Sequence, residues 1–180
     1  MRSIRSERGA ALVEFAFIFS LVLMIAIGTF EWGMGFRDRL SVSQSVREGA
    51  RVGAALGDRS GADCGIIEAS AGALAAIGDN DVKELWIYES DVDGTVSGFR
   101  QIYRPAAGTD DPLTLKCSGG WYPIQLTWPE SSRDNAGPVR DWLGVKVVLD
   151  HEWKTGFLWW QGTVQWEEKV VMHLEPKVIS

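Results

Sequence analysis

Residues 10–30 of the chain read AALVEFAFIFSLVLMIAIGTF, a stretch in which Glu14 is the only charged residue. As an α-helix, which rises about 1.5 Å per residue, this stretch would span roughly 30 Å, the thickness of the hydrocarbon core of a bilayer. Arg2, Arg5 and Arg8 precede it, whereas the charges that follow it nearly balance. Because positive residues favour the cytoplasmic side, the pattern predicts a single membrane crossing with a cytoplasmic N-terminus.

A basic start followed by an apolar run is also typical of a cleaved secretory signal peptide. Two features favour a retained helix. The run is long for the hydrophobic region of a signal peptide, and no small-x-small cleavage site closes it. It continues through Gly33 and Gly35, a predicted weak point, into proline-free sequence that is compatible with helix from Phe36 to Leu56.

Glu14 is the informative residue of the stretch, because a carboxylate inside an apolar helix needs a partner or a purpose. The surrounding residues, RGAALVEF from Arg8 to Phe15, resemble the processing site of type IV pilins and pseudopilins. In those proteins a prepilin peptidase cuts after a glycine and leaves glutamate as the fifth residue of the mature chain. Cleavage between Gly9 and Ala10 would place Glu14 fifth.

The longer run RGAALVEFAF resembles, more narrowly, the TadE-like minor pseudopilins of the tight-adherence (Flp-type) pilus system. Two further segments are similar to that family, VREGARV at 46–52 and KVVMHLEP at 169–176. The resemblance implies a non-enzymatic minor pilin-like subunit that takes part in assembling a type IV-like pilus. It implies four kinds of partner: a prepilin peptidase, the major pilin, other minor pseudopilins and an inner-membrane assembly platform.

Processing would create a cation at the membrane edge, the new amine of Ala10. The carboxylate of Glu14, followed by Phe15 in the apolar run, is a suitable counter-ion, because pairing lowers the cost of both charges in a low dielectric. Two interpretations remain open. Glu14 could pair with the amine of a neighbouring subunit and set the register of packed helices, or it could neutralise the amine of its own helix one turn away.

The expected domain organisation has three parts. Residues 1–9 form a cytoplasmic leader, residues 10–57 a long helix that crosses the inner membrane at about 10–30, and residues 58–180 an exported domain that is periplasmic or, after assembly, on the cell surface. Glycines and polar residues at 57–61 end the long helix, and an amphipathic helix follows from about Ile66 to Gly78.

Strands are expected in four places within this exported domain, at 82–88, 99–103, 145–153 and 163–174. Asp93-Gly94 predicts the turn of the first hairpin, and the segment 104–142, rich in proline, glycine and aspartate, predicts mostly loop. The predicted fold class is therefore α+β, with a long membrane-spanning helix packed on a small antiparallel sheet and a second short helix.

The two cysteines, Cys64 and Cys117, both fall in the predicted exported domain. In an oxidising compartment a bridge is the default interpretation, and it would tie the long loop to the second helix. Two free thiols remain the alternative, because pairing cannot be deduced from sequence.

Several signals of other chemistry are weak. The two histidines, His151 and His173, have no metal-ligand partner at short spacing, which predicts a structural or solvent-facing role, with no metal and no cofactor. Asp91-Val92-Asp93-Gly94-Thr95 begins like a calcium loop, but Ile102 stands at the position of the closing glutamate. No nucleophile motif frames a catalytic residue, so neither an enzyme nor a small-molecule substrate is expected.

Charge and aromatic content limit the remaining functions. The formal net charge is −6, and the first nine residues carry three arginines against one glutamate, so the rest of the chain carries −8. Such a chain repels phosphate backbones, which argues against nucleic-acid binding. Trp153, Phe157, Trp159, Trp160 and Trp166 form an aromatic cluster that predicts packing, with a sugar-binding surface as the alternative.

The main rival function is a single-pass binding or adhesion domain that stays anchored to membrane lipid and never enters a filament. Such a protein would keep its leader, whereas a pilin-like subunit would lose residues 1–9.

Overall fold

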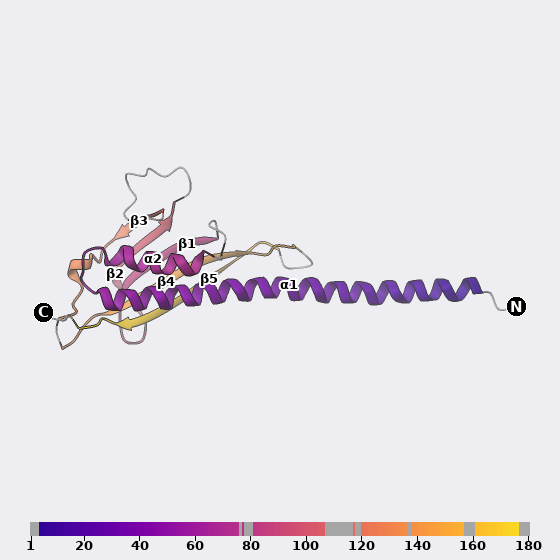
Figure 1. Ribbon diagram of the computed structural model, residues 1–180, viewed down its shortest axis with the longest axis horizontal. Coiled ribbons are helices and arrows are strands. Elements are labelled where there is room, and N and C mark those ends of the chain that lie inside the picture. The colour runs from indigo at the N-terminus through magenta and orange to yellow at the C-terminus, as the bar shows by residue number, and fades with distance from the viewer. Residues whose placement is uncertain are drawn as a thin grey trace. The chain divides into compact units, whose positions relative to one another are not determined.

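The computed structural model describes residues 4–75, 77, 81–106, 117, 120–136, 138–156 and 161–176. The chain divides into two compact units. The first consists of residues 1–37 and 153–162, and the second of residues 38–152 and 163–180. Figure 1 shows the order of the helices and strands along the chain.

Helix α1 runs from Ile4–Leu56 without a break (Figure 1). It passes through Gly33 and Gly35, where the sequence predicted a weak point, because one glycine costs a helix only about 1 kcal/mol relative to alanine. The helix ends as predicted at Gly57, whose φ of 57° is left-handed and whose N–H donates to Gly53. Such a left-handed glycine is a common helix terminator.

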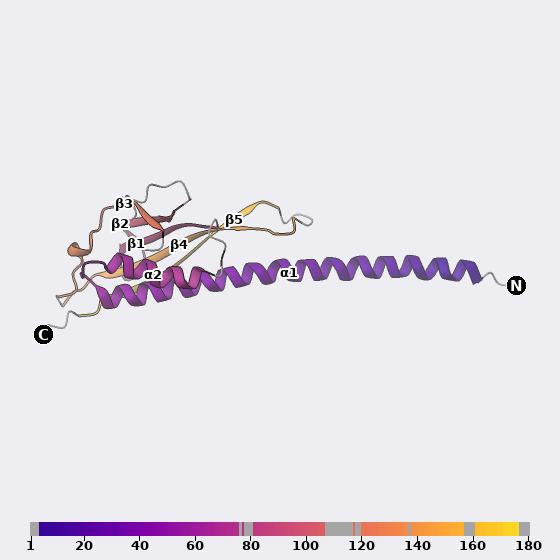
Figure 2. The ribbon, with the colours of Figure 1, turned by 45° about the horizontal axis from the view of Figure 1, so that its top comes forward.

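The sheet belongs to the second unit and has five antiparallel strands in the order β3-β2-β1-β4-β5 (Figure 2). The strand bounds are β1 Val82–Ser90, β2 Val96–Pro105, β3 Trp121–Leu126, β4 Trp142–Glu152 and β5 Thr163–His173. Four of these strands lie where the sequence predicted them, and the α+β fold class is confirmed.

Strand β3 corrects the prediction that 104–142 is mostly loop. The segment also contains a short 3-10 helix, η2 (Glu130–Ser132). Pro123 argues against a strand because proline cannot donate a ladder hydrogen bond, but β3 pairs with β2 and lies at the edge of the sheet, where proline is tolerated. The ladder shifts register beside it, between Ile102 and Tyr103.

The turn between β1 and β2 is confirmed at Asp93-Gly94. Gly94 has a φ of 83° and its N–H donates to the carbonyl of Asp91. The Asp93 side chain accepts a 3.0 Å hydrogen bond from the backbone N–H of Thr95, and this bond lowers the pKa of the Asp93 carboxyl. The segment from Asp91 to Thr95, which begins like a calcium loop in sequence, therefore forms a hairpin turn.

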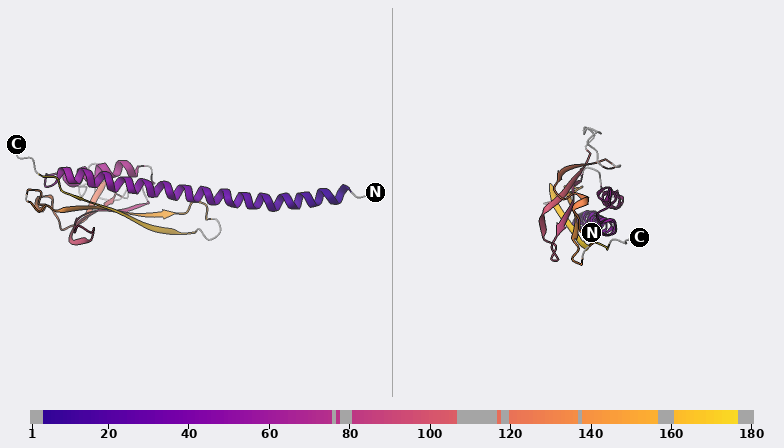
Figure 3. Two further views of the ribbon diagram at one scale, coloured as in Figure 1. Left: turned by 90° about the horizontal axis from the view of Figure 1, so that it is seen from below. Right: turned by 90° about the vertical axis from the view of Figure 1, so that its left-hand side faces the viewer.

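Helix α2 (Ala62–Leu74) begins four residues before Ile66 and ends at Leu74, so the prediction that it continues to Gly78 is wrong. Within the second unit, α2 and the C-terminal part of α1 lie on the same face of the sheet (Figure 3). Close packing depends on small residues. A Cβ built on Gly53 of α1 would lie 2.8 Å from Ile66 of α2 and 2.9 Å from Leu143 of β4.

The core of the second unit fills the space between these helices and the sheet. The helices contribute Val42, Val46, Ala50, Ile66, Ile67 and Leu74, and the strands contribute Leu85, Ile87, Tyr103, Leu143, Val145, Val147 and Leu149. The residues that follow β5 contact two other segments. The N–H of Leu174 donates to the carbonyl of Asp141, and that of Glu175 donates to the carbonyl of Ala54 in α1. The chain after β5 is thereby held against the C-terminal part of α1 and the residue that precedes β4.

Candidate functional site

The predicted processing and assembly residues all lie in helix α1. Gly9, Ala10, Glu14 and Phe15 are exposed. Ala10 and Glu14 are four residues apart and therefore share one helix face, one turn apart. Within the described part of the chain, no group hydrogen-bonds to the Glu14 carboxylate. An exposed carboxylate within an apolar helix is thus available to a group from outside the chain.

The apolar side chains around Glu14 point outward on every side of α1. The large exposed ones are Leu12, Val13, Phe15, Phe17, Ile18, Phe19, Leu21, Val22, Leu23, Met24 and Ile25. The helix is long and apolar enough to cross a membrane. A helix that is apolar on all faces needs an apolar surrounding, and a lipid bilayer supplies one.

The hydroxyl groups inside this stretch donate hydrogen bonds to backbone carbonyls of the same helix. The hydroxyl of Ser20 donates to the carbonyl of Ala16 at 2.8 Å, and the hydroxyl of Thr29 donates to that of Ile25 at 2.8 Å. These bonds suit a hydrocarbon environment, where a hydroxyl without a partner is costly. Glu14 is therefore the polar side chain that sets this stretch apart.

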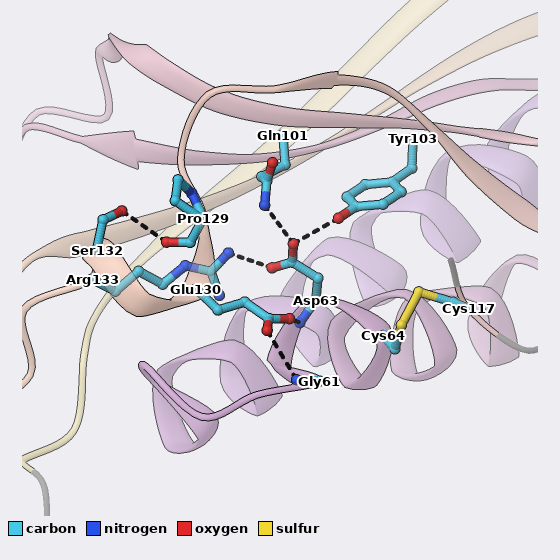
Figure 4. A network of polar contacts seen from close by, with 10 residues as sticks. All are labelled: Gly61, Asp63, Cys64, Gln101, Tyr103, Cys117, Pro129, Glu130, Ser132 and Arg133. Carbon is cyan, nitrogen blue, oxygen red and sulfur yellow. Dashed lines mark hydrogen bonds and ion pairs between the residues drawn. A yellow bond between two sulfur atoms is a disulfide. The ribbon is translucent and has the colours of Figure 1, made fainter. Parts of the chain in front are cut away.

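In the second unit, the structure joins Cys64 of α2 to Cys117 in a disulfide. The bridge links the second helix to the segment between β2 and β3, so the two cysteines are not free thiols. Figure 4 shows the bridge beside a network of buried polar side chains.

Asp63 is the centre of this network and has no solvent-exposed surface. One carboxylate oxygen accepts hydrogen bonds from the amide of Gln101 at 2.7 Å and from the hydroxyl of Tyr103 at 2.6 Å (Figure 4). The other accepts one from the guanidinium of Arg133, which also lies over the ring of Trp128, 4.7 Å from its centroid. The network joins α2, β2 and the segment after η2.

Tyr103 remains protonated in this setting. Burial, together with the negative charge of Asp63 and the hydrogen bond donated to it, raises the pKa of the Tyr103 hydroxyl well above its ordinary value. The hydroxyl therefore acts as a permanent donor and is not a titrating or nucleophilic group near neutral pH.

Glu130 of η2 caps the N-terminus of α2. The N-cap residue is Gly61, which has no side chain to accept a hydrogen bond. The Glu130 carboxylate accepts instead from the N–H of Gly61 at 2.9 Å and from that of Asp63 at 2.8 Å. A carboxylate at a helix N-terminus also opposes the positive end of the helix dipole, so this contact stabilises α2.

Both histidines contact other parts of the second unit. His151 of β4 is buried, with Nδ1 at 2.9 Å from Asp38 of α1 and its ring stacked on Trp166 of β5. His173 donates from Nε2 to the carbonyl of Arg140 at 3.0 Å. Within the described residues no group of three or more His, Cys, Asp or Glu side chains could hold a metal ion.

The aromatic cluster predicted at the C-terminal end is divided. Trp166 packs against the core of the second unit, whereas Trp153 belongs to the first unit. Phe157, Trp159 and Trp160 lie outside the described residues.

The sequence did not single out Glu31, the second acidic residue of interest in α1. Its side chain is buried and accepts a 2.8 Å hydrogen bond from the backbone N–H of Thr155, which also belongs to the first unit. A charged residue directly after an apolar stretch normally suggests exposure to water. Only the small residues Gly28 and Gly35, one turn before and after it, indicate a face that another segment approaches.

Comparison with known proteins supports the motif that surrounds Glu14. The sequence model for TadE-like protein matches residues 9–51, which include Gly9, Ala10, Glu14 and most of α1. No curated protein and no solved structure matches the chain. Over residues 9–51 the chain is therefore similar to TadE-like proteins, in agreement with the resemblance inferred from the motif.

Proposed function

We propose that the protein is a minor pilin-like structural subunit that takes part in assembling a tight-adherence, type IV-like pilus, with no catalytic role of its own. The observation that carries this proposal is Glu14, an exposed carboxylate in an apolar helix, one turn after the glycine motif. The match of residues 9–51 to TadE-like proteins supports the same pilus system.

A prepilin peptidase would cut between Gly9 and Ala10 and release the leader 1–9. The new amine of Ala10 would then start a helix in which Glu14 lies one turn further along. Pairing with the Glu14 carboxylate of an adjacent subunit would offset both charges in the membrane and would set the axial register of the two helices. Phe15, exposed beside Glu14, would contact the adjacent apolar helix.

The remaining parts of the proposal follow from this helix. Residues 10–30 would cross the inner membrane once, and residues 58–180 would form the exported domain. The partners would be the peptidase, the major pilin, other minor pseudopilins, the assembly platform and membrane lipid. The disulfide between Cys64 and Cys117 is compatible with an oxidising, extracytoplasmic location.

The processing step can be tested with Gly9→Leu in cells that express the prepilin peptidase. A Cβ on Gly9 meets no atom within 4 Å, so a side chain at this position starts in open space. Gly33→Leu is the matched control, because Gly33 is also a helical glycine with open space around it. Mass analysis of the purified chains should find residues 1–9 absent from the wild type and Gly33→Leu, and present in Gly9→Leu.

Assembly can be tested with Glu14→Ala, with Val13→Ala as a control at a neighbouring exposed position. Glu14→Ala should be processed but should no longer co-purify with the other pilus subunits, whereas Val13→Ala should retain them. If Glu14→Ala retains these partners, the proposed pairing is wrong.

The alternative is an anchored binding or adhesion domain that is not incorporated into a filament. The bulk of the second unit argues against a major pilin, which repeats along a thin fibre, and is compatible with either a minor subunit or an anchored domain. The mass analysis separates the two functions, because an anchored domain would keep Met1 in the presence of an active peptidase.

A further inference from the structure

A buried hydrogen bond fixes a distant segment of the chain at the end of the apolar stretch. Glu31 follows Phe30 directly, and its side chain is 1% exposed. It accepts the backbone N–H of Thr155 at 2.8 Å, within a segment that follows β4. Gly28 and Gly35, on the same face of α1, are also buried. The first unit therefore brings residues 153–156 to one level of the helix.

Three aromatic side chains gather at this level. The ring of Trp32 lies edge-on to that of Trp153, with 6.4 Å between centroids, and 5.9 Å from that of Phe36. Trp32 is 52% exposed and Phe36 59% exposed. This interfacial aromatic cluster, Trp32, Phe36 and Trp153, is therefore open to its surroundings on a large part of its surface.

The position of the cluster along α1 suggests what surrounds it. Residues 10–30 fill roughly 30 Å of helix, so Trp32 falls just beyond the hydrocarbon core, in the headgroup region. Tryptophan is enriched at this depth, because its ring is apolar and its N–H needs a polar partner. The exposed Lys154 supplies a cation at the same level.

We propose that residues 153–156 are a second membrane contact, in which the interfacial aromatic cluster lies in the lipid headgroup region and Glu31 holds the segment at that depth. The proposal rests on the membrane crossing of the proposed function. A lipid surface is favoured over a second protein because the cluster is continuous along α1 with the exposed apolar stretch, through Phe30.

The depth of the segment can be measured in the full chain, reconstituted in vesicles of phosphatidylcholine and phosphatidylglycerol. Since Cys64 and Cys117 are bridged, one added cysteine can carry a nitroxide label. Thr155→Cys reports the segment and keeps the backbone N–H. Ile18→Cys lies in the apolar stretch, and Val92→Cys lies in the exposed β1–β2 turn as the aqueous reference.

The readout is the collision rate of each label with oxygen, which concentrates in lipid, relative to that with a water-soluble nickel chelate. The oxygen-to-nickel ratio at Thr155→Cys should exceed that at Val92→Cys several-fold and remain below that at Ile18→Cys. Equal ratios at Thr155→Cys and Val92→Cys, with a high ratio at Ile18→Cys, would overturn this inference and leave the membrane crossing intact. A low ratio at Ile18→Cys would overturn both.

A protein contact would give a different result, in which the label at Thr155→Cys is shielded from both reagents and the shielding increases with protein density in the vesicle. That outcome would also overturn the lipid proposal. The role of Glu31 is tested by adding Glu31→Ala to Thr155→Cys. The label should become more accessible to the nickel chelate, whereas the exposed control Glu175→Ala should leave the ratio unchanged. If the oxygen-to-nickel ratio is unchanged by Glu31→Ala, then Glu31 does not position the segment.

Discussion

Arg133 and Asp63 form an ion pair in which neither side chain is exposed to solvent, although 70 positions separate them in the chain. Burying two charges is costly, and such a pair stabilises a fold only where further hydrogen bonds accompany it. Gln101 and Tyr103 supply these bonds to Asp63. The pair therefore fixes the segment after η2 against α2, beside the disulfide.

Removing one charge of the Arg133–Asp63 pair should lower the free energy of unfolding more than removing both charges. Arg133→Met would leave Asp63 as a buried carboxylate without its cation, and the free energy of unfolding should fall by about 3–5 kcal/mol. The double variant Asp63→Asn with Arg133→Met keeps an acceptor for Gln101 or Tyr103 but leaves no charge. It should be more stable than Arg133→Met alone in urea unfolding of the detergent-solubilised chain. A strictly additive loss would show that the two residues are not coupled.

The disulfide should contribute measurably to stability. Cys64 and Cys117 are 53 positions apart, and closing a loop of this size stabilises a fold by about 4 kcal/mol in the chain-entropy model. Replacing both cysteines with serine should lower the free energy of unfolding by about this amount. Alkylation of the unreduced, denatured wild type should modify no cysteine, and alkylation after reduction should modify two.

Adding one methyl group at the contact between α1 and α2 should lower the stability of the fold. Gly53→Ala places a Cβ within 3.0 Å of Ile66 and Leu143, and overpacking of this kind costs about 1–3 kcal/mol. Gly72→Ala in α2 is the matched control, because its Cβ meets nothing within 4 Å. Thermal unfolding should show a lower midpoint for Gly53→Ala and an equal or higher one for Gly72→Ala, since alanine favours a helix.

Stability should decrease at alkaline pH because of Tyr103. The fold raises the pKa of this hydroxyl, mainly by burial, whereas in the unfolded chain it titrates at about pH 10. Below about pH 10 both states hold the proton and the contribution is constant. Above it only the folded state does, so the free energy of unfolding falls as the pH rises.

Tyr103→Phe removes this titration. In urea unfolding, the free energy of unfolding of this variant should decrease less steeply above about pH 10 than that of the wild type. Burial also raises the pKa of Tyr88, so part of the slope should remain. A slope in Tyr103→Phe equal to that of the wild type would contradict this account.

The sequence predicted those parts of the fold that repeat a local pattern. The apolar stretch and the absence of proline up to Leu56 predicted α1, and Gly57 predicted its end. Strand β4 was recognisable from its apolar run. Strand β3 was missed because Pro123 weakens the pattern, and only its place at the sheet edge makes that proline acceptable.

The polar network could not be predicted in the same way. Asp63 meets Gln101, Tyr103 and Arg133 across 38, 40 and 70 positions of the chain, and no spacing rule links residues so far apart. By contrast, the motif from Gly9 to Glu14 is local, and for that reason the sequence alone indicated it. For Glu31, the sequence shows that a charged residue follows the apolar stretch, but it does not indicate the partner, Thr155, which is 124 positions away.

The bond from the N–H of Glu175 to Ala54 has a consequence for biosynthesis. The second unit cannot complete this contact until residue 175 has left the ribosome. The apolar stretch at residues 10–30 leaves the ribosome much earlier. The apolar stretch is therefore exposed before the second unit can close. A nascent chain arrested before β5 would leave the core residues Val42 and Val46 without the packing that the closed unit supplies.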